Sequence, residues 1–569
     1  MALTLMLLLP LLCAVALIAI PGESRAERGI ALGGTVVTAV LAVIVVAGRH
    51  EIDVPWIRSL GIRWHFGVDG ISAALVLLTA LLTVAVVVHT LAGRIPPGGS
   101  GSTFLGCILL VETGALATFL ARDAILFFIA FEVVLVPMWV LIRSFGDDHV
   151  PDERRSDAAG RFVLFTVLGS TLMLVGILFL VHHQGTSDLT ELARLHGEGI
   201  SRSLEIAIAG MLLLGLGIKV PLWPVHTWLP PAHTVAPTAG SVLLAAVLLK
   251  MGTYGIVRLV VATVPNGLAA LSPVLAILGV VGILWGGLAC LVERDLKRLI
   301  AYSSVAHMGF VVLALASGSD TGLQAALLGN IAHGIVAALL FFVVGDLKEQ
   351  WGSADLRTAR VALRDTAPRF GVVLLIGLAA ALGLPGLVSF WGEFLALYAA
   401  WSPAPDRPAT LMRVCVVLGA VGLALAAAYA LRVARLVWSG EGTSRADAEA
   451  AAEAAARARV RSRARVGAHR DTPVQAGSAS SAVGAVSAAT ATGSGVGAGT
   501  SVGAGSGVEG GVEGGGAVEG AVVDARGARW AVVLALAVAV VVLGVLPQLL
   551  LGVSGPDAVR LITGAGVLP

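Results

Sequence analysis

The chain has 569 residues, of which 57% are hydrophobic and 13% are charged, and its mean hydropathy is +0.91. Soluble domains carry about twice this charged fraction, so the composition excludes an ordinary soluble enzyme. The net charge of +2 points to no particular partner, and we expect no nucleic acid to bind.

Apolar runs of about 20 residues recur along the chain, and each is long enough to cross a bilayer core about 30 Å thick. They predict an all-α polytopic membrane protein with about fourteen transmembrane helices. The first run has no basic start and is followed at once by another span, so we expect a helix rather than a signal peptide. The expected spans are 2–20, 29–48, 70–92, 102–121, 122–143, 161–182, 204–226, 237–263, 267–292, 298–317, 321–346, 369–400, 411–439 and 529–552.

The basic residues indicate an orientation for these spans. With both termini outside, the inner loops and span ends hold roughly 26 Lys and Arg and the outer ones about 10, which is the bias of the positive-inside rule. We therefore expect a multi-pass protein of a bacterial plasma membrane with its N- and C-termini outside. The inner side then includes 440–527, an Ala/Arg stretch followed by a Gly/Ser/Ala/Val-rich segment too poor in core residues to pack, for which we expect disorder.

Four ionisable residues stand out within the apolar runs: Glu132, Lys219, Lys250 and Glu393. A charge at membrane depth costs at least about 2.5–3.5 kcal/mol and usually marks an ion path or a pair. Only 4 of the 38 basic residues are lysines, and two of these four lie in spans. Lysine can release its proton when buried whereas arginine cannot, so we predict proton translocation. The alternative is a static ion pair with Glu132 or Glu393 that holds helices together.

Histidines form a second polar set. His226 and His233 flank "TWLPPA", while His307 and His333 lie on consecutive spans with Ser303, Ser304 and Asn330. A neutral histidine satisfied inside a bundle is the alternative for each. We predict a proton relay through His226, His307 and His333, with the neighbouring polar groups ordering water.

Two spans contain helix breakers. Pro221 and Pro224 follow Lys219, and "GLPGLVSF" with Pro385 and Gly386 precedes Glu393. Freed backbone carbonyls are tolerated in lipid only where they are buried in protein or line a wet cavity. Two interrupted helices in comparable places of two halves resemble the layout of ion transporters.

Four cysteines lie singly in apolar runs, and the sequence has no phosphate loop, dinucleotide-binding, haem or HExxH motif. We expect no metal site and no cofactor in this chain. If the protein takes part in a redox reaction, another chain must carry the redox centres.

Several motifs in order carry a family resemblance: "FGVDGISAALVLLT", "FEVVLVPMWVLI", "KVPLWPVHTWLPPAHTVAPTAGSVLLAAVLLKMGTYG", "RDLKRLIAYSSVAHMGF" and "LPGLVSFWGEF". Over roughly residues 60–440 the chain resembles the antiporter-like membrane subunits of respiratory complex I, the NADH–quinone oxidoreductase, and most of all the M-type subunits, counterparts of mitochondrial chain 4. Glutamate at 393, where L- and N-type subunits usually carry lysine, favours the M type. The chain departs from the family at Pro231, where aspartate is usual, and in the 440–527 insertion.

The resemblance implies two inverted five-helix repeats. We divide the chain into N-terminal helices (1–101), a first antiporter-like half (102–260) broken near 219–226, a second half (261–439) broken near 383–393, the low-complexity loop (440–527), and a final helix with the C-terminus (528–569). The resemblance also implies residue roles: Glu132 modulates Lys219, Lys250 is the central connecting lysine, and Glu393 is the terminal charged residue.

The implied function is proton translocation within a proton-pumping NADH:quinone oxidoreductase. NADH, FMN, iron–sulfur clusters and quinone are expected in partner subunits, with L- and N-type subunits as neighbours. The alternatives are a subunit of a multi-subunit sodium/proton antiporter and a structural membrane subunit whose charges only pair.

Overall fold

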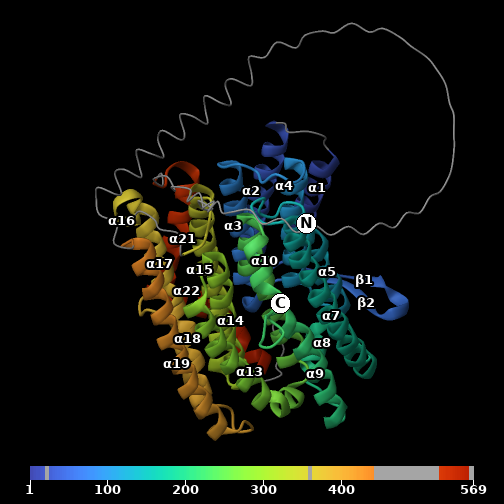
Figure 1. The fold of residues 1–569 in the computed structure, drawn as a ribbon. Helices are drawn as coiled ribbons and strands as arrows, with labels where there is room; N and C mark the ends of the chain where they lie inside the picture. The colour runs from blue at the N-terminus through green and yellow to red at the C-terminus, as the bar shows by residue number, and fades with distance from the viewer. Residues whose placement is uncertain (20–24, 357–361, 441–523, 563–569) are drawn as a thin grey trace, which may run out of the picture. The chain divides into compact units, whose positions relative to one another are not determined.

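The computed structural model describes residues 1–19, 25–356, 362–440 and 524–562. Most of the predicted low-complexity loop therefore lies outside the described residues. The described part is a bundle of long helices with one small β-hairpin (Figure 1).

Twelve helical stretches of the described residues are long and apolar enough to cross a membrane. They are α1 (Ala2–Ala19), α2 (Arg25–Gly48), α3 (Gly70–Leu91), α4 (Gly101–Leu120), α5 with α6 (Ala124–Val133, Leu135–Arg143), α7 (Asp152–Gln184), α11 to η3 (Thr238–Val261), α13 (Pro265–Val292), α14 (Leu296–Ala316), α15 (Asp320–Trp351), α19 with η4 (Ala409–Val433, Ala434–Trp438) and α21 (Gly527–Val545).

Two further predicted spans, 204–226 and 369–400, are each interrupted. The first consists of α9 (Arg202–Lys219) and α10 (Leu229–Val235), and the second of α17 (Pro368–Ala381) and α18 (Val388–Trp401). None of these pieces is counted among the twelve stretches: α9 has 18 residues but carries Arg202, Glu205 and Lys219, α10 has only 7 residues, and α17 and α18 have only 14 residues each. The last predicted span also ran too far, since α21 ends at Val545 and a separate α22 (Gln548–Ile562) begins after Pro547.

The connecting loops gather at the two ends of the bundle. At one end, β1 (Glu51–Ile57) and β2 (Ile62–Gly67) form an antiparallel hairpin that packs beside α5, near the short helices η1 (Arg58–Leu60) and α8 (Leu189–Leu195) (Figure 1). At the other end, Lys348 is ion-paired with Asp147 and Arg529 with Asp346, close to α16 (Leu363–Thr366). Loops of the described residues thus lie at both ends of the bundle.

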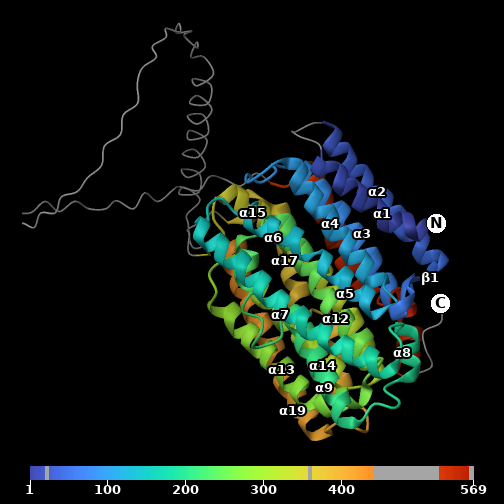
Figure 2. The same cartoon turned by 90° about the vertical axis from the view of Figure 1, so that its right-hand side faces the viewer.

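The helices differ strongly in burial. The most apolar 18-residue windows of α11–η3 and α15 are 100% and 94% buried inside the bundle, whereas those of α1, α2, α19–η4 and α21 are only 22–33% buried. Figure 2 shows α1 and α2 along one edge. Polar groups on the central helices are therefore shielded from lipid by protein, which is the condition for carrying charge at membrane depth.

Two π-helical turns interrupt the most buried stretch. η2 (Leu244–Leu248) and η3 (Val257–Val261) lie on either side of α12 (Leu249–Ile256). Such turns are frequent at functional sites because they rotate side chains and loosen the backbone ladder. Lys250 lies in α12, two residues after the end of η2.

Candidate functional site: a buried row of ionisable side chains

The first helix break places Lys219 at the end of α9. Pro221 and Pro224 lack backbone N–H groups, so the helix cannot continue, and α10 begins only at Leu229. The indole of Trp228 donates to the carbonyl of Ile218 at 3.0 Å and satisfies one of the acceptors that the break frees. The break thus exposes backbone to the protein interior and not to lipid.

Lys219 is buried among aromatic rings. Its Nζ lies 4.9 Å from the ring centroid of Phe131 and 5.9 Å from that of Phe162. Within the described residues Nζ has no hydrogen-bond partner, and no carboxylate oxygen lies within 4.0 Å. Glu132, on α5, interacts with it electrostatically, and Glu132 Oε1 is likewise buried without a partner. The two groups form no direct ion pair within 4.0 Å in this structure, and their interaction is electrostatic.

Lys250 is fully buried and well bonded. Its Nζ donates to the carbonyl of Ala245 at 2.7 Å and lies at hydrogen-bonding distance, 2.5 Å, from Nδ1 of His333 on α15. About one helical turn away the two helices are joined again, since Thr253 donates to Asn330 at 2.8 Å. The structure therefore connects the two central helices through polar side chains.

The polar row continues from His333 to the second helix break. The rings of His333 and His307 are 5.6 Å apart, and Nδ1 of His307 lies 2.9 Å from Oε1 of Glu393 on α18. A cavity of about 10 Å³ lies among His307, His333, Ser389 and Glu393, close to the volume that one water molecule requires. His307 Nε2 and Glu393 Oε2 are buried and unpartnered among the described residues, so polar groups line the region of this cavity.

Other predicted relay groups lie differently. His226 packs edge-on against Tyr302, with ring centroids 6.5 Å apart, and is not hydrogen-bonded to the row among the described residues. The hydroxyls of Ser303 and Ser304 donate to the carbonyl of Ile300 in their own helix. Their hydroxyl protons are therefore bonded within α14, and their oxygen lone pairs remain available to accept from water.

His233 is a residue that the predicted relay omitted. It is fully buried, its ring stacks on Phe341 at 4.5 Å, and neither ring nitrogen has a partner among the described residues. It interacts electrostatically with both Lys297 and Lys250. Its position within "TWLPPAH" was visible in the sequence, but nothing in the sequence placed it between two lysines.

Lys297, near the start of α14, is a further lysine that the sequence did not single out. It is 3% exposed, and its Nζ donates to the carbonyl of Ala236 at 2.9 Å. A cavity of about 300 Å³ at this end of the bundle reaches Lys297 and is also lined by His89, Asp147 and Lys348. The cavity, Lys297 and His233 thus lead towards Lys250.

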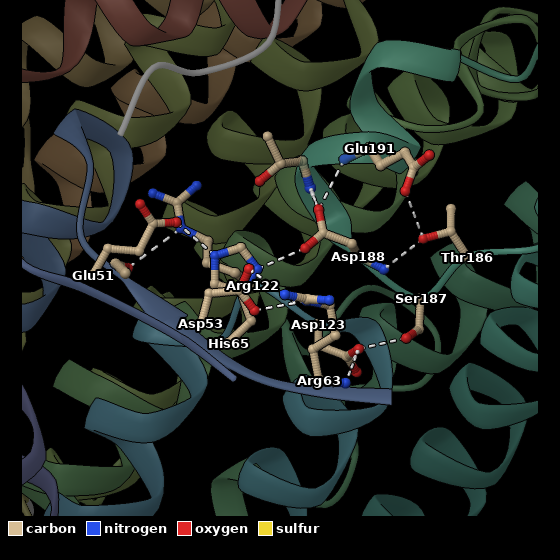
Figure 3. A network of polar contacts seen from close by, with 12 residues as sticks. Glu51, Asp53, Arg63, His65, Arg122, Asp123, Thr186, Ser187, Asp188 and Glu191 are labelled. Carbon is tan, nitrogen blue, oxygen red and sulfur yellow. Dashed lines mark hydrogen bonds and ion pairs between the residues drawn. The ribbon is translucent and has the colours of Figure 1, made fainter. Parts of the chain in front are cut away.

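A second polar cluster lies at the opposite end of the bundle (Figure 3). His65 on β2 is held between Asp188 (Nδ1 to Oδ2, 2.6 Å) and Glu51 (Nε2 to Oε1, 2.5 Å). Burial disfavours the charged ring, but the two carboxylates outweigh it and raise the pKa of His65. Burial likewise opposes ionisation of Asp188, and the bond to His65 prevails and lowers its pKa. The cluster joins the hairpin to the loop before α8.

Asp69, at the start of α3, is enclosed by two arginines. Its Oδ2 lies 3.0 Å from Arg122 Nη2 and 2.5 Å from Arg258 Nη2. Burial would raise the pKa of Asp69, but the two guanidinium groups outweigh it and lower that pKa. Asp69 also caps α3 by accepting from Ile71 and Ser72. None of this network was predicted, because its members are distant in sequence.

The described residues offer one group with metal-ligand side chains, Asp147, Asp148 and His149, whose ligand atoms lie within 4.8 Å of one another. Asp147 is already ion-paired with Lys348, and the other two side chains are exposed. Exposed acidic groups are common without an ion, so we assign no metal here.

Comparison with known proteins places this geometry in a family. Residues 121–419 match the model of the membrane region of the NADH:quinone oxidoreductase/Mrp antiporter family. The chain is 38% identical over 403 residues to the NADH-quinone oxidoreductase subunit M of Pseudomonas aeruginosa, covering 69% of this chain and 76% of that one.

Solved structures agree with the sequence comparison. A chain of respiratory complex I from Thermus thermophilus superposes with a TM-score of 0.76 at 25% identity, and the match covers both chains completely. A chain of the Mrp complex from a Dietzia species shares the fold with a TM-score of 0.76 at 22% identity, over 99% of this chain and 97% of that one.

Proposed function

We infer, because the chain belongs to the NADH:quinone oxidoreductase/Mrp antiporter family of membrane proteins, that it is the M-type proton-translocating membrane subunit of an NADH–quinone oxidoreductase. The redox reaction takes place in partner subunits, which hold NADH, FMN, iron–sulfur clusters and quinone. This chain contributes the buried groups through which protons move. Its similarity to subunit M along more than two thirds of both chains supports this function over that of an antiporter subunit.

One observation supports the proton path above all others: the buried row Lys250–His333–His307–Glu393. A proton on Lys250 Nζ has an acceptor 2.5 Å away in His333 Nδ1. Transfer from His333 to His307 spans rings 5.6 Å apart, and one water molecule in the adjoining cavity would bridge them. Glu393, bonded to His307 at 2.9 Å, receives the proton at the second helix break. Each member is a group that both takes up and releases protons.

Glu132 and Lys219 supply the switch in the first half. Within the described part of the chain, Lys219 Nζ faces aromatic rings and the charge of Glu132 and makes no hydrogen bond. A small change in the field at Glu132 therefore alters how firmly Lys219 keeps its proton. Electron transfer in the partner subunits supplies that change, and the proton then moves towards Lys250.

Lys297 and His233 form the entry to this path. The 300 Å³ cavity brings solvent to Lys297, and His233 lies within electrostatic range of Lys297 and of Lys250. Lys297 accordingly loads His233, which passes the proton to the central lysine. His226 has a secondary place beside Tyr302, near the first break.

The interrupted helices are the centres of two inverted repeats. On this proposal α9–α10 and α17–α18 count as one span each beside the twelve continuous stretches. Each break lies beside an ionisable group, Lys219 or Glu393. The protein lies in a bacterial plasma membrane with both termini outside and with L- and N-type subunits as neighbours.

The proposal is tested by Lys219→Ala and Glu393→Ala in the assembled complex. Proton pumping should fall while NADH oxidation by partner subunits continues at an uncoupled or reduced rate. Full pumping with normal NADH oxidation in both variants would contradict the proton path and favour a structural subunit whose charges only stabilise the bundle.

A sodium/proton antiporter subunit is the second candidate, because the same fold occurs in an Mrp complex. The two functions differ in what drives transport. Proton movement that requires NADH and is independent of sodium supports the first, whereas sodium-driven proton exchange without NADH supports the second.

A further inference from the structure

We propose that an anionic phospholipid binds between α3 and α21, with an acyl chain in an apolar groove and its phosphate at Arg28 and Arg94. The groove is a cavity of about 660 Å³ along α3, lined almost wholly by apolar side chains. This volume lies within the range of about 300–1,000 Å³ typical of ligand sites.

Small residues on α21 create the groove. Ala528, Ala531, Ala535 and Ala539 recur at helical spacing and line one wall. The opposite wall is α3, from Ala73 to Val88, about 22 Å of helix at 1.5 Å per residue. That length exceeds the about 15 Å of one leaflet's hydrocarbon, half of a core of about 30 Å, so an extended acyl chain fits along the wall.

The groove opens sideways to the bilayer. Leu81, Leu549 and Val553 line it and are 58%, 55% and 43% exposed. A chain can therefore enter from the lipid phase without passing through the bundle. On a soluble protein such an apolar surface would mark an interaction site. In a bilayer the surrounding lipids can fill the groove.

A polar site lies directly beyond one end of the groove. Val88 lines the groove, and the next turn of α3, with Thr90 and Leu91, lines a second cavity of about 400 Å³. Arg28, at the start of α2, and Arg94, after α3, line this second cavity. Tail site and head site thus follow one another along a single helix.

The two arginines carry charge that the described part of the chain leaves unbalanced. Within the described ranges neither Arg28 nor Arg94 has a carboxylate oxygen within 4.0 Å, and both side chains are exposed. By contrast Arg529, whose guanidinium lies against Gly93, is neutralised by Asp346 and Glu349. Guanidinium groups bind phosphate oxygens in a fork geometry, and basic pockets beside transmembrane helices select anionic head groups. Apolar wall and unpaired cations together favour a phospholipid over a peptide helix.

The test measures phospholipid retained by the purified complex, quantified by mass spectrometry after washing in mild detergent. Arg28→Gln with Arg94→Gln should remove one anionic phospholipid per complex, whereas Arg154→Gln, an exposed arginine on α7 with no carboxylate within 4.0 Å among the described residues, should remove none. Ala85→Phe, which fills the groove, should remove the same lipid, and Val37→Phe on the exposed face of α2 should not.

A second measurement remains informative if a variant fails to assemble. Phosphatidylglycerol with a photoreactive acyl chain, added to membranes of the unaltered complex, should label peptides of α3 and α21. Unchanged lipid content in both the arginine and the Ala85→Phe variants would overturn the proposal. So would labelling confined to other helices, or a disulfide between Ala85→Cys and a neighbouring subunit, because a protein would then fill the groove.

Discussion

Lys250→Met tests the central lysine of the proposed path. The change removes two donor contacts, to Ala245 O and His333 Nδ1, and each partner left without a hydrogen bond costs about 1–3 kcal/mol. It also removes a charge whose burial in the membrane costs at least about 2.5–3.5 kcal/mol. The two effects nearly cancel, so we expect the subunit to fold and assemble. Proton pumping through this subunit should nevertheless be lost.

Lys250→Arg separates charge from proton release. An isolated guanidinium holds its proton about 2 pKa units more tightly than an isolated ammonium, which is about 3 kcal/mol, or roughly a 100-fold smaller deprotonated fraction. If Lys250 only balances charge, this variant should pump normally. If it carries protons, pumping should fall almost as far as in Lys250→Met.

The assay is NADH-driven acidification of inverted membrane vesicles, normalised to the rate of NADH oxidation. Leu249→Met is the matched control, because it places the same side chain at the neighbouring, equally buried position of α12. Protons pumped per NADH that are unchanged in both Lys250 variants would refute the role of Lys250. A loss of the same size in Leu249→Met would show that the helix tolerates no change there, and would refute the specificity of the effect.

Three further predictions concern the other polar groups. Glu393→Gln keeps the shape of the side chain but removes its charge, so pumping per NADH should drop at least several-fold while assembly is retained; equal pumping would exclude Glu393 from the path. Asp69→Asn leaves two buried guanidinium groups poorly paired and should lower stability by about 3–5 kcal/mol, seen as earlier thermal unfolding of the solubilised complex; an unchanged transition would contradict the pairing. His65→Gln should lower the free energy of unfolding most between about pH 4.5 and 6.5. The raised pKa of His65 stabilises the folded protein fully below the ordinary value of about 6.5, and this stability is lost as pH rises through the folded-state pKa. A stability difference between variant and unaltered protein that grows with pH would contradict this.

Much of the helical architecture could be predicted because a membrane span is specified by a continuous stretch of sequence. A run of about 20 apolar residues specifies a helix wherever it lies in the chain, and Pro221 breaks a helix through its own missing N–H. The hairpin at Glu51–Gly67 was missed since its alternation is short and, among the residues that the structure describes, its strands pair only with each other and with Ala121.

The site was predictable in its members but not in its contacts. Lys219 and Lys250 stand out because a lysine in an apolar span is costly, whatever surrounds it. Lys250 contacts His333, which is 83 residues away in the sequence. This contact depends on how α12 packs against α15, and no local sequence pattern specifies that packing. The same reason explains why His233 and Lys297 were not joined to the path: their relation to Lys250 exists only in three dimensions.

The most direct test of the proposed function is to purify the tagged, full-length chain from its native membrane and reconstitute what comes with it into sealed vesicles. The expected preparation oxidises NADH, reduces quinone and moves protons across the vesicle membrane, and Lys250→Met abolishes the contribution of this subunit to that movement. A preparation that exchanges sodium for protons and oxidises no NADH would contradict the assignment.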